Sequence, residues 1–71
     1  MAKTDCIIVR TAGRRSDDLR SEASRIANTS KVDWWVEQTD KGLRFCFEGS
    51  HLAKQMFASF CDNLGLAHQD G

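Results

Sequence analysis

The stretch KVDWWVEQTDKGLRFCFE, residues 31–48, decides the fold of this chain. Residues 31–38 and residues 43–48 each alternate apolar and polar side chains, which is the period-two pattern of a half-buried strand. The intervening residues 39–42 end on a glycine, the residue that most readily adopts a positive φ in a tight turn. The stretch therefore predicts a β-hairpin with one apolar face.

The same alternation assigns every side chain of the hairpin to one of two faces. Side chains expected on the covered, apolar face are Val32, Trp34, Val36, Leu43, Phe45 and Phe47. Side chains expected on the opposite face are Asp33, Trp35, Glu37, Arg44, Cys46 and Glu48. The second set keeps one large aromatic residue among charged neighbours, so we expect Trp34 to be buried and Trp35 to be more exposed.

Outside the hairpin, one strand and two helices are predicted. Residues 4–11 are β-branched and apolar at their centre, which predicts a strand. A helix is expected to begin with Ser16 as N-cap and with acidic residues in its first turn, and to end at residues 28–30. A second helix is expected after residues 49–50, with Gly65 as its C-terminal cap. The expected apolar stripes are Leu19, Ala23, Ile26 and Ala27 on the first helix, and Leu52, Met56, Phe57, Phe60 and Leu64 on the second.

The resulting order β-α-β-β-α makes this an α+β chain. It resembles the ferredoxin-like split βαβ arrangement with the fourth strand missing or reduced to residues 66–68. The resemblance implies a three-stranded sheet with both helices on one face. We expect a single domain over residues 1–66 and a flexible C-terminal tail over residues 67–71.

Length, charge and cysteine usage bound the class of protein. A chain of 71 residues has room for one domain, and its 10 basic and 10 acidic residues cancel, so no global field favours nucleic acid or a membrane. Its three cysteines are an odd number without CxxC spacing, which is not typical of a secreted disulfide framework. The apolar run at residues 6–9 is too short for a signal peptide or a membrane span. We expect a cytoplasmic protein without a membrane partner.

The helix-free face of the predicted sheet is the candidate interaction face. It is expected to present Ile8, Arg10, Trp35, Arg44 and Cys46. An exposed aromatic residue in an apolar strip is typical of contact surfaces, so the favoured function is a non-catalytic protein-interaction or regulatory module, working as a homodimer or on another protein. We expect the unpaired edge of the first strand to join the two copies. The alternative is that Arg44 stacks over Trp35 and no partner is needed.

The loop before the first helix is a candidate ligand site. Gly13, Arg14, Arg15 and Ser16 combine backbone N–H groups, guanidinium groups and a hydroxyl, which together can hold an anion. The strand and helix order, with a glycine after the first strand, is similar to that of ACT domains. That resemblance implies a sensor of an anion or an amino acid, with Gly13 in the ligand loop. The alternative for these four residues is a solvated turn.

The segment from Lys41 to Phe47 is similar to the RNP1 stretch of RNA-recognition motifs, which implies RNA binding. RNP1 needs outward aromatic side chains that stack on bases. Here Phe45 alternates in phase with Leu43 and Phe47, so its side chain is expected on the covered face. We therefore expect nucleic acid not to be the partner.

Catalytic, metal and cofactor chemistry find little support. His51 and His68 do not stand at ligand spacing with each other or with a cysteine. Cys6 and Cys46 are expected on one face of adjacent strands, as two buried or half-buried thiols, with a redox pair or a soft-metal site as the alternatives. Cys61 is expected to be a small core residue. We therefore expect no enzyme activity, no metal and no cofactor.

Overall fold

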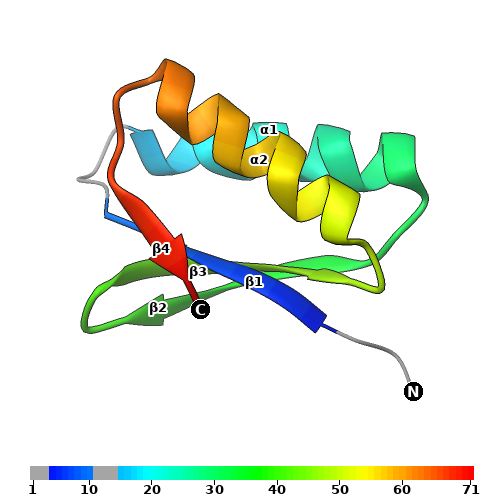
Figure 1. Cartoon of the computed structure of the whole chain (residues 1–71), viewed down its shortest axis with the longest axis horizontal. Coiled ribbons are helices and arrows are strands. Elements are labelled where there is room, and N and C mark those ends of the chain that lie inside the picture. Colours follow the sequence, from blue (N-terminus) through cyan, green and yellow to red (C-terminus); the bar gives the residue numbers. More distant parts are fainter. Residues whose placement is uncertain (1–3, 11–14) are drawn as a thin grey trace.

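The computed structural model describes residues 4–10 and residues 15–71. Strands and helices follow one another along the chain in the order β-α-β-β-α-β, as drawn in Figure 1. Their bounds are β1 (Thr4–Val9), α1 (Arg15–Ser30), β2 (Trp34–Thr39), β3 (Gly42–Glu48), α2 (His51–Asn63) and β4 (His68–Asp70).

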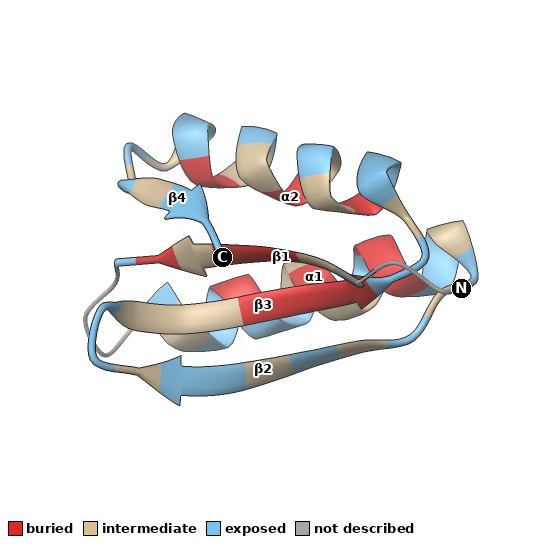
Figure 2. Ribbon diagram, turned by 60° about the horizontal axis from the view of Figure 1, so that its bottom comes forward, coloured by how far each residue is buried: buried red, intermediate tan, exposed pale blue. Residues whose placement is uncertain are grey.

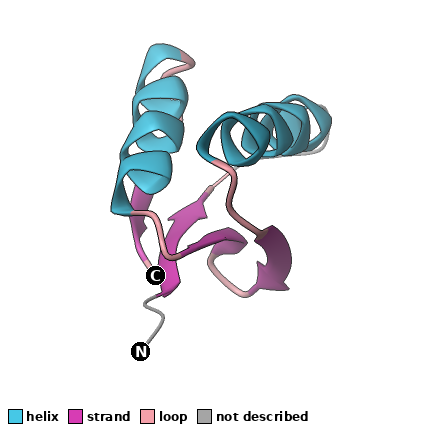
Figure 3. Cartoon of the chain, turned by 90° about the vertical axis from the view of Figure 1, so that its right-hand side faces the viewer, coloured by secondary structure: helices cyan, strands magenta, loops and turns pink. Residues whose placement is uncertain are grey.

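The strands form one antiparallel sheet in the order β2-β3-β1-β4. Both helices lie over the same face of this sheet, and the other face has no helix (Figures 1 and 3). The α+β class and the two-layer arrangement therefore agree with expectation. The number of strands does not, because the sheet has four strands rather than three.

The fourth strand closes the edge of β1. Ile7 and Val9 pair with Asp70 and His68, and the backbone N–H of Arg10 donates to the carbonyl oxygen of Ala67 at 3.0 Å. The expectation that two strand-one edges join two copies is therefore wrong, since β4 already occupies that edge. Residues 67–71, which the sequence suggests as a tail, contain this strand.

Polar contacts to α2 hold β4 in place. The Lys54 ammonium donates to the Asp70 carboxylate at 2.9 Å, and His68 Nε2 lies 2.7 Å from Asp62 Oδ1. The hydrogen bond from Lys54, with its charge, holds the pKa of Asp70 below its usual value. Strand β4 thus joins the sheet without an apolar face. A search for alternating apolar and polar residues therefore does not find this strand.

The hairpin turn follows the predicted geometry. Thr39 pairs with Gly42 across a two-residue loop, and Thr39 Oγ1 donates to the Gly42 carbonyl oxygen at 2.7 Å. Gly42 has a φ of 137°, and a Cβ at this position would collide with the carbonyl oxygen of Val9 in β1. Glycine is needed here because the turn and the neighbouring strand approach each other closely.

Helix α1 buries the predicted stripe, namely Leu19, Ala23, Ile26 and Ala27. It begins at Arg15, one residue before the expected cap, so Ser16 lies in its first turn. Helix α2 begins after Ser50, whose Oγ accepts a hydrogen bond from the backbone N–H of Ala53 at 3.0 Å. That hydrogen bond satisfies one of the free N–H groups at the helix start.

The apolar stripe of α2 is rotated from the predicted one. The fully buried residues are Ala53, Phe57 and Cys61, whereas Leu52 is 64% exposed. Ala53 and Cys61 lie one turn on either side of Phe57, and their small side chains allow the helix to come close to the sheet. The prediction that Leu52 belongs to the core is therefore wrong, because Phe57, flanked by the small Ala53 and Cys61, faces the strands. The other predicted residues, Met56, Phe60 and Leu64, are partly buried against the core.

The Phe57 ring is the contact that joins α2 to the sheet. Its centroid lies 4.6 Å from that of Phe45 and 5.6 Å from that of Phe47. Phe45 also stacks on Trp34 at 6.4 Å. The predicted burial of Phe45 is confirmed, and Phe47 is equally buried.

Both helices end in a Schellman motif, in which a left-handed residue turns the chain. In α2 the left-handed residue is Gly65, with a φ of 71°, and the N–H of Leu66 donates to the carbonyl oxygen of Cys61 at 2.9 Å. In α1 it is Lys31, with a φ of 57°, and the N–H of Val32 donates to the carbonyl oxygen of Ala27 at 3.0 Å. The Gly65 cap was predicted, while the lysine cap carries the steric cost of a Cβ in this region.

Truncation of Phe57 tests its place in the core. We expect Phe57→Ala to lower the free energy of unfolding by about 3–5 kcal/mol, because the loss of a buried ring leaves a cavity. The matched control Leu52→Ala, on the same helix but exposed, should change it by no more than about 0.5 kcal/mol. Urea unfolding followed by circular dichroism measures both. Similar midpoints for the two variants would contradict the rotation of α2 described above.

The two helix caps allow a reciprocal test. We expect Lys31→Gly to stabilise the chain by about 0.5–1 kcal/mol, because glycine removes the Cβ from a left-handed residue. The mirror substitution Gly65→Lys should destabilise it by about 1 kcal/mol for the same reason. Thermal unfolding midpoints report both. Shifts of the same sign in the two variants would show that backbone conformation does not govern these caps.

Candidate functional site: the helix-free face

The helix-free face is the side of the sheet that points away from α1 and α2, and it is turned toward the viewer in Figure 2. Strand register arranges its side chains in rows. One row runs from Trp35 through Cys46 to Cys6, and the next runs from Glu37 through Arg44 and Ile8 to Gln69. The central strands of this face are largely buried, whereas β2 is exposed or half-buried (Figure 2).

The structure brings the five candidate face residues together. Arg10 is exposed, Ile8 and Arg44 are half-buried, and Cys46 is buried. Trp35 keeps 36% of its surface exposed, although its register partner Cys46 has none. The face therefore presents one accessible aromatic side chain beside a buried, rigid centre.

A disulfide between Cys6 and Cys46 forms that centre. The two residues are direct register partners on β1 and β3 and are 40 residues apart in sequence. The expectation of two free thiols is therefore wrong, because antiparallel pairing places the two side chains opposite each other on the same face. Sequence spacing gives no sign of this pairing.

Arg44 is held by hydrogen bonds in the neighbouring row. Its Nη1 donates to Glu37 Oε2 at 3.0 Å, and its Nε and Nη2 both donate to the Gly71 carbonyl oxygen at 3.3 Å. These contacts link β2, β3 and the chain after β4 across the face. The Arg44 guanidinium is thereby held between the Glu37 carboxylate and the Gly71 carbonyl oxygen.

The two ends of the face carry opposite charge. Asp33 and Glu48 are exposed at one end, where the N–H of Glu48 donates to the carbonyl oxygen of Asp33 at 2.9 Å. Arg10 and Lys41 are exposed at the other end, beside the single exposed acid Asp40 of the turn. The face thus runs from an acidic end, over Trp35 and the disulfide, to a basic end.

The candidate ligand loop is described only in part. Gly13 and Arg14 lie outside the described residues, Arg15 is the exposed first residue of α1, and Ser16 is half-buried in its first turn. Asp17 and Asp18 follow in the same turn. The structure therefore does not place these four candidates together as a site.

The RNP1-like segment directs its aromatic side chains inward. Phe45 and Phe47 are fully buried beneath the helices, where each contacts Phe57. Aromatic rings in this position cannot stack on bases. The outward residues of the same strand are Arg44, the disulfide-bonded Cys46 and Glu48.

Cys61 and the two histidines are the remaining candidates for reactive chemistry. Burial, followed by the nearby Asp62 charge, raises the pKa of the Cys61 thiol to about 11, so it stays protonated and non-nucleophilic at neutral pH. His51 lies 3.5 Å from Asp5, and His68 lies beside Asp62. In the described part of the chain, no three His, Cys, Asp or Glu side chains are grouped to hold a metal ion.

Comparisons with known proteins found no matching family model, no matching curated protein and no matching solved structure. Among residues 4–10 and 15–71, no helix has the length and apolar character needed to cross a membrane. The geometry of the helix-free face is therefore the basis on which a function can be inferred.

Two contributors to this face are missing from the sequence-based set. Gln69 arrives with β4, and Lys41 arrives from the hairpin turn. Because the sequence pattern contains no signal for β4, Gln69 could not be placed there. The turn was predicted, but the face toward which Lys41 points depends on the neighbouring β1.

The disulfide is expected to contribute to stability through the loop it closes. For a separation of 40 residues, the chain-entropy relation predicts that reduction of the disulfide lowers the free energy of unfolding by about 4 kcal/mol at most. Urea unfolding of the oxidised chain, with and without a phosphine reductant, measures this difference. The double variant Cys6→Ala/Cys46→Ala is the control and should not respond to the reductant. Equal midpoints for the oxidised and reduced wild-type chain would contradict a stabilising bridge.

Proposed function

We propose that this chain is a non-catalytic interaction module that forms a homodimer through its helix-free face. We further assign its scaffold to the ferredoxin-like split βαβ arrangement. The strand order β2-β3-β1-β4 and the alternation of strands with helices support that assignment.

The observation that carries the proposal is the exposed Trp35 beside the disulfide. A tryptophan on a surface without a covering helix is the type of residue that dominates interface energies when a partner desolvates it. Cys6 and Cys46 fix β1 and β3 covalently behind it. A partner would therefore meet a preorganised surface, which lowers the entropy cost of binding.

The charge distribution favours a second copy as the partner. A two-fold axis lying in the interface plane and perpendicular to the strands reverses strand direction between the copies. The basic end of one face, with Arg10 and Lys41, then lies over the acidic end of the other, with Asp33 and Glu48. Because the contact is isologous, the acidic end of the first copy also lies over the basic end of the second. Each dimer therefore contains two identical contacts between opposite charges.

The other two candidate functions have less support. RNA binding depended on outward aromatic residues in the RNP1-like segment, and those residues are buried. The sensor of an anion or amino acid depended on Gly13 and Arg14, which lie outside the described residues. A second copy is the partner for which the described residues offer both an aromatic anchor and complementary charge.

Sedimentation equilibrium over a range of concentrations tests the proposal. We expect the mass to rise from the chain mass of 8.0 kDa toward twice that value. Trp35→Ala should weaken dimerisation by at least about thirtyfold, the effect of losing a 2 kcal/mol anchor. Leu52→Ala, which removes an exposed apolar residue from α2, is the control and should dimerise as the wild type does.

A charge-reversal pair distinguishes this interface from other modes of association. Lys41→Glu and Glu48→Lys should each weaken the homodimer, because each places like charges opposite one another. An equimolar mixture of the two variants should form a heterodimer, since both contacts are then between opposite charges. A mass of 8.0 kDa at every concentration would rule out the homodimer, and no recovery in the mixture would rule out this orientation.

A further inference from the structure

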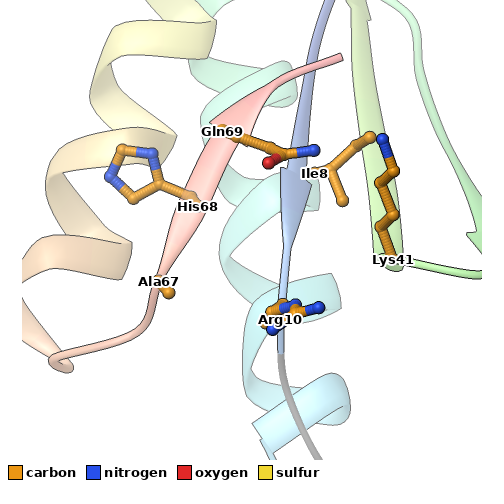
Figure 4. Close-up of a pocket in the computed structure, with 6 residues that line it drawn as sticks. All are labelled: Ile8, Arg10, Lys41, Ala67, His68 and Gln69. Atoms are coloured by element: carbon orange, nitrogen blue, oxygen red, sulfur yellow. The ribbon is translucent and has the colours of Figure 1, made fainter.

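A hollow of about 60 Å³ opens on the helix-free face between β1, β4 and the hairpin turn. Figure 4 shows the side chains of Gln69 and Lys41 reaching toward Ile8 from opposite sides, with Arg10 one step further along β1. The ring of His68 points away from them, toward α2, in agreement with its contact to Asp62. The lining residues are Ile8, Arg10, Lys41, Ala67, His68 and Gln69.

The hollow holds two cationic groups that the described protein does not neutralise. Neither the Arg10 guanidinium nor the Lys41 ammonium forms an ion pair or side-chain hydrogen bond with another residue in the described ranges. Three nearby acids are already paired, Glu37 with Arg44, Asp62 with His68, and Asp70 with Lys54. Asp40, which precedes Lys41 in the turn, is exposed and forms no ion pair within the described residues.

Backbone acceptors at the rim are also engaged. The Ala67 carbonyl oxygen accepts the hydrogen bond from the Arg10 N–H at 3.0 Å. An anion in the hollow would therefore meet donors from Arg10, Lys41 and the Gln69 amide, and the apolar side chain of Ile8 as its floor. The Lys41 ammonium and the Gln69 amide lie beside Ile8, and Arg10 lines the hollow further along β1 (Figure 4). Two positive charges and one amide donor along one hollow suit a group with several acceptor oxygens.

We propose that this hollow is a binding site for a small oxyanion, either a carboxylate or a phosphate group. The Arg10 guanidinium binds one pair of oxygens, the Lys41 ammonium supplies the second charge, and the Gln69 amide donates from the side of β4. Ile8 leaves room for an alkyl substituent on the anion. The site needs β4, since without that strand Gln69 and the Ala67 rim would be absent.

The anion site overlaps the proposed homodimer interface at Arg10 and Lys41, but it does not depend on that proposal. In the homodimer these cations would face Asp33 and Glu48 of the second copy, so a free anion and a second copy would compete. The test therefore uses Trp35→Ala as its background, because Trp35 does not line the hollow. Binding can then be measured whether or not the wild-type chain dimerises.

Amide chemical-shift titration with sodium phosphate and, separately, with sodium acetate tests the site, with ionic strength held constant by sodium chloride. We expect saturable shifts confined to the residues around Ile8, Arg10, Lys41 and Gln69. The anion that saturates at the lower concentration identifies the preferred oxyanion. Arg10→Gln and Lys41→Gln should each weaken the affinity about fivefold, the effect of losing one exposed ionic contact.

Arg20→Gln is the matched control, since Arg20 is an exposed arginine on α1 and does not line the hollow. It should leave the titration unchanged. Shifts that stay linear for both anions, or an affinity that falls equally in Arg20→Gln and Arg10→Gln, would overturn the proposal. The side chains of Arg10 and Lys41 are exposed, so Arg10→Gln and Lys41→Gln should unfold at the wild-type midpoint. Lys41→Arg keeps the positive charge and should retain anion binding.

Discussion

The contact of Phe57 with Phe45 and Phe47 is the interaction on which the rest of the structure depends. It places one ring of α2 against two rings of β3, all of them buried. In a chain of 71 residues a few such side chains form most of the core, because a small domain buries a limited fraction of its surface. Once these rings take one side of the sheet, strand alternation determines what the other side presents.

The helix-free face is a consequence of that arrangement. With Phe45 and Phe47 directed to the helices, their neighbours Arg44 and Cys46 must point away from them. Cys46 then meets Cys6 across the strand pair, and Trp35 lies beside the disulfide. The interaction module proposed above rests on this face, with its one exposed aromatic residue and its covalently fixed centre.

Strand β4 completes this face by a different kind of interaction. It contributes no apolar side chain, and α2 holds it through Lys54 and Asp62. Its alternation directs His68 and Asp70 to α2 and leaves Gln69 on the helix-free face. The chain end that follows supplies the Gly71 carbonyl oxygen to Arg44, and the hollow lies between this strand and the hairpin turn.

Local pattern in the sequence was sufficient for the hairpin, the buried stripe of α1, the Gly65 cap, and the opposite directions of Trp34 and Trp35. These features depend on residues a few positions apart, whose periodicity and conformational preferences act within one element. The same pattern also placed Ile8, Arg10, Trp35, Arg44 and Cys46 on one face, since period two is a local property.

Only the tertiary structure decided the fourth strand, the rotation of α2, the Cys6–Cys46 disulfide and the hollow. Strand β4 is polar, so it follows from pairing with β1 and from contacts with α2 rather than from its own residues. The disulfide depends on the register between strands that are 40 residues apart, and the exposure of Leu52 depends on which residues let α2 approach the sheet. Such contacts join distant parts of the chain, and no periodicity within one segment encodes them.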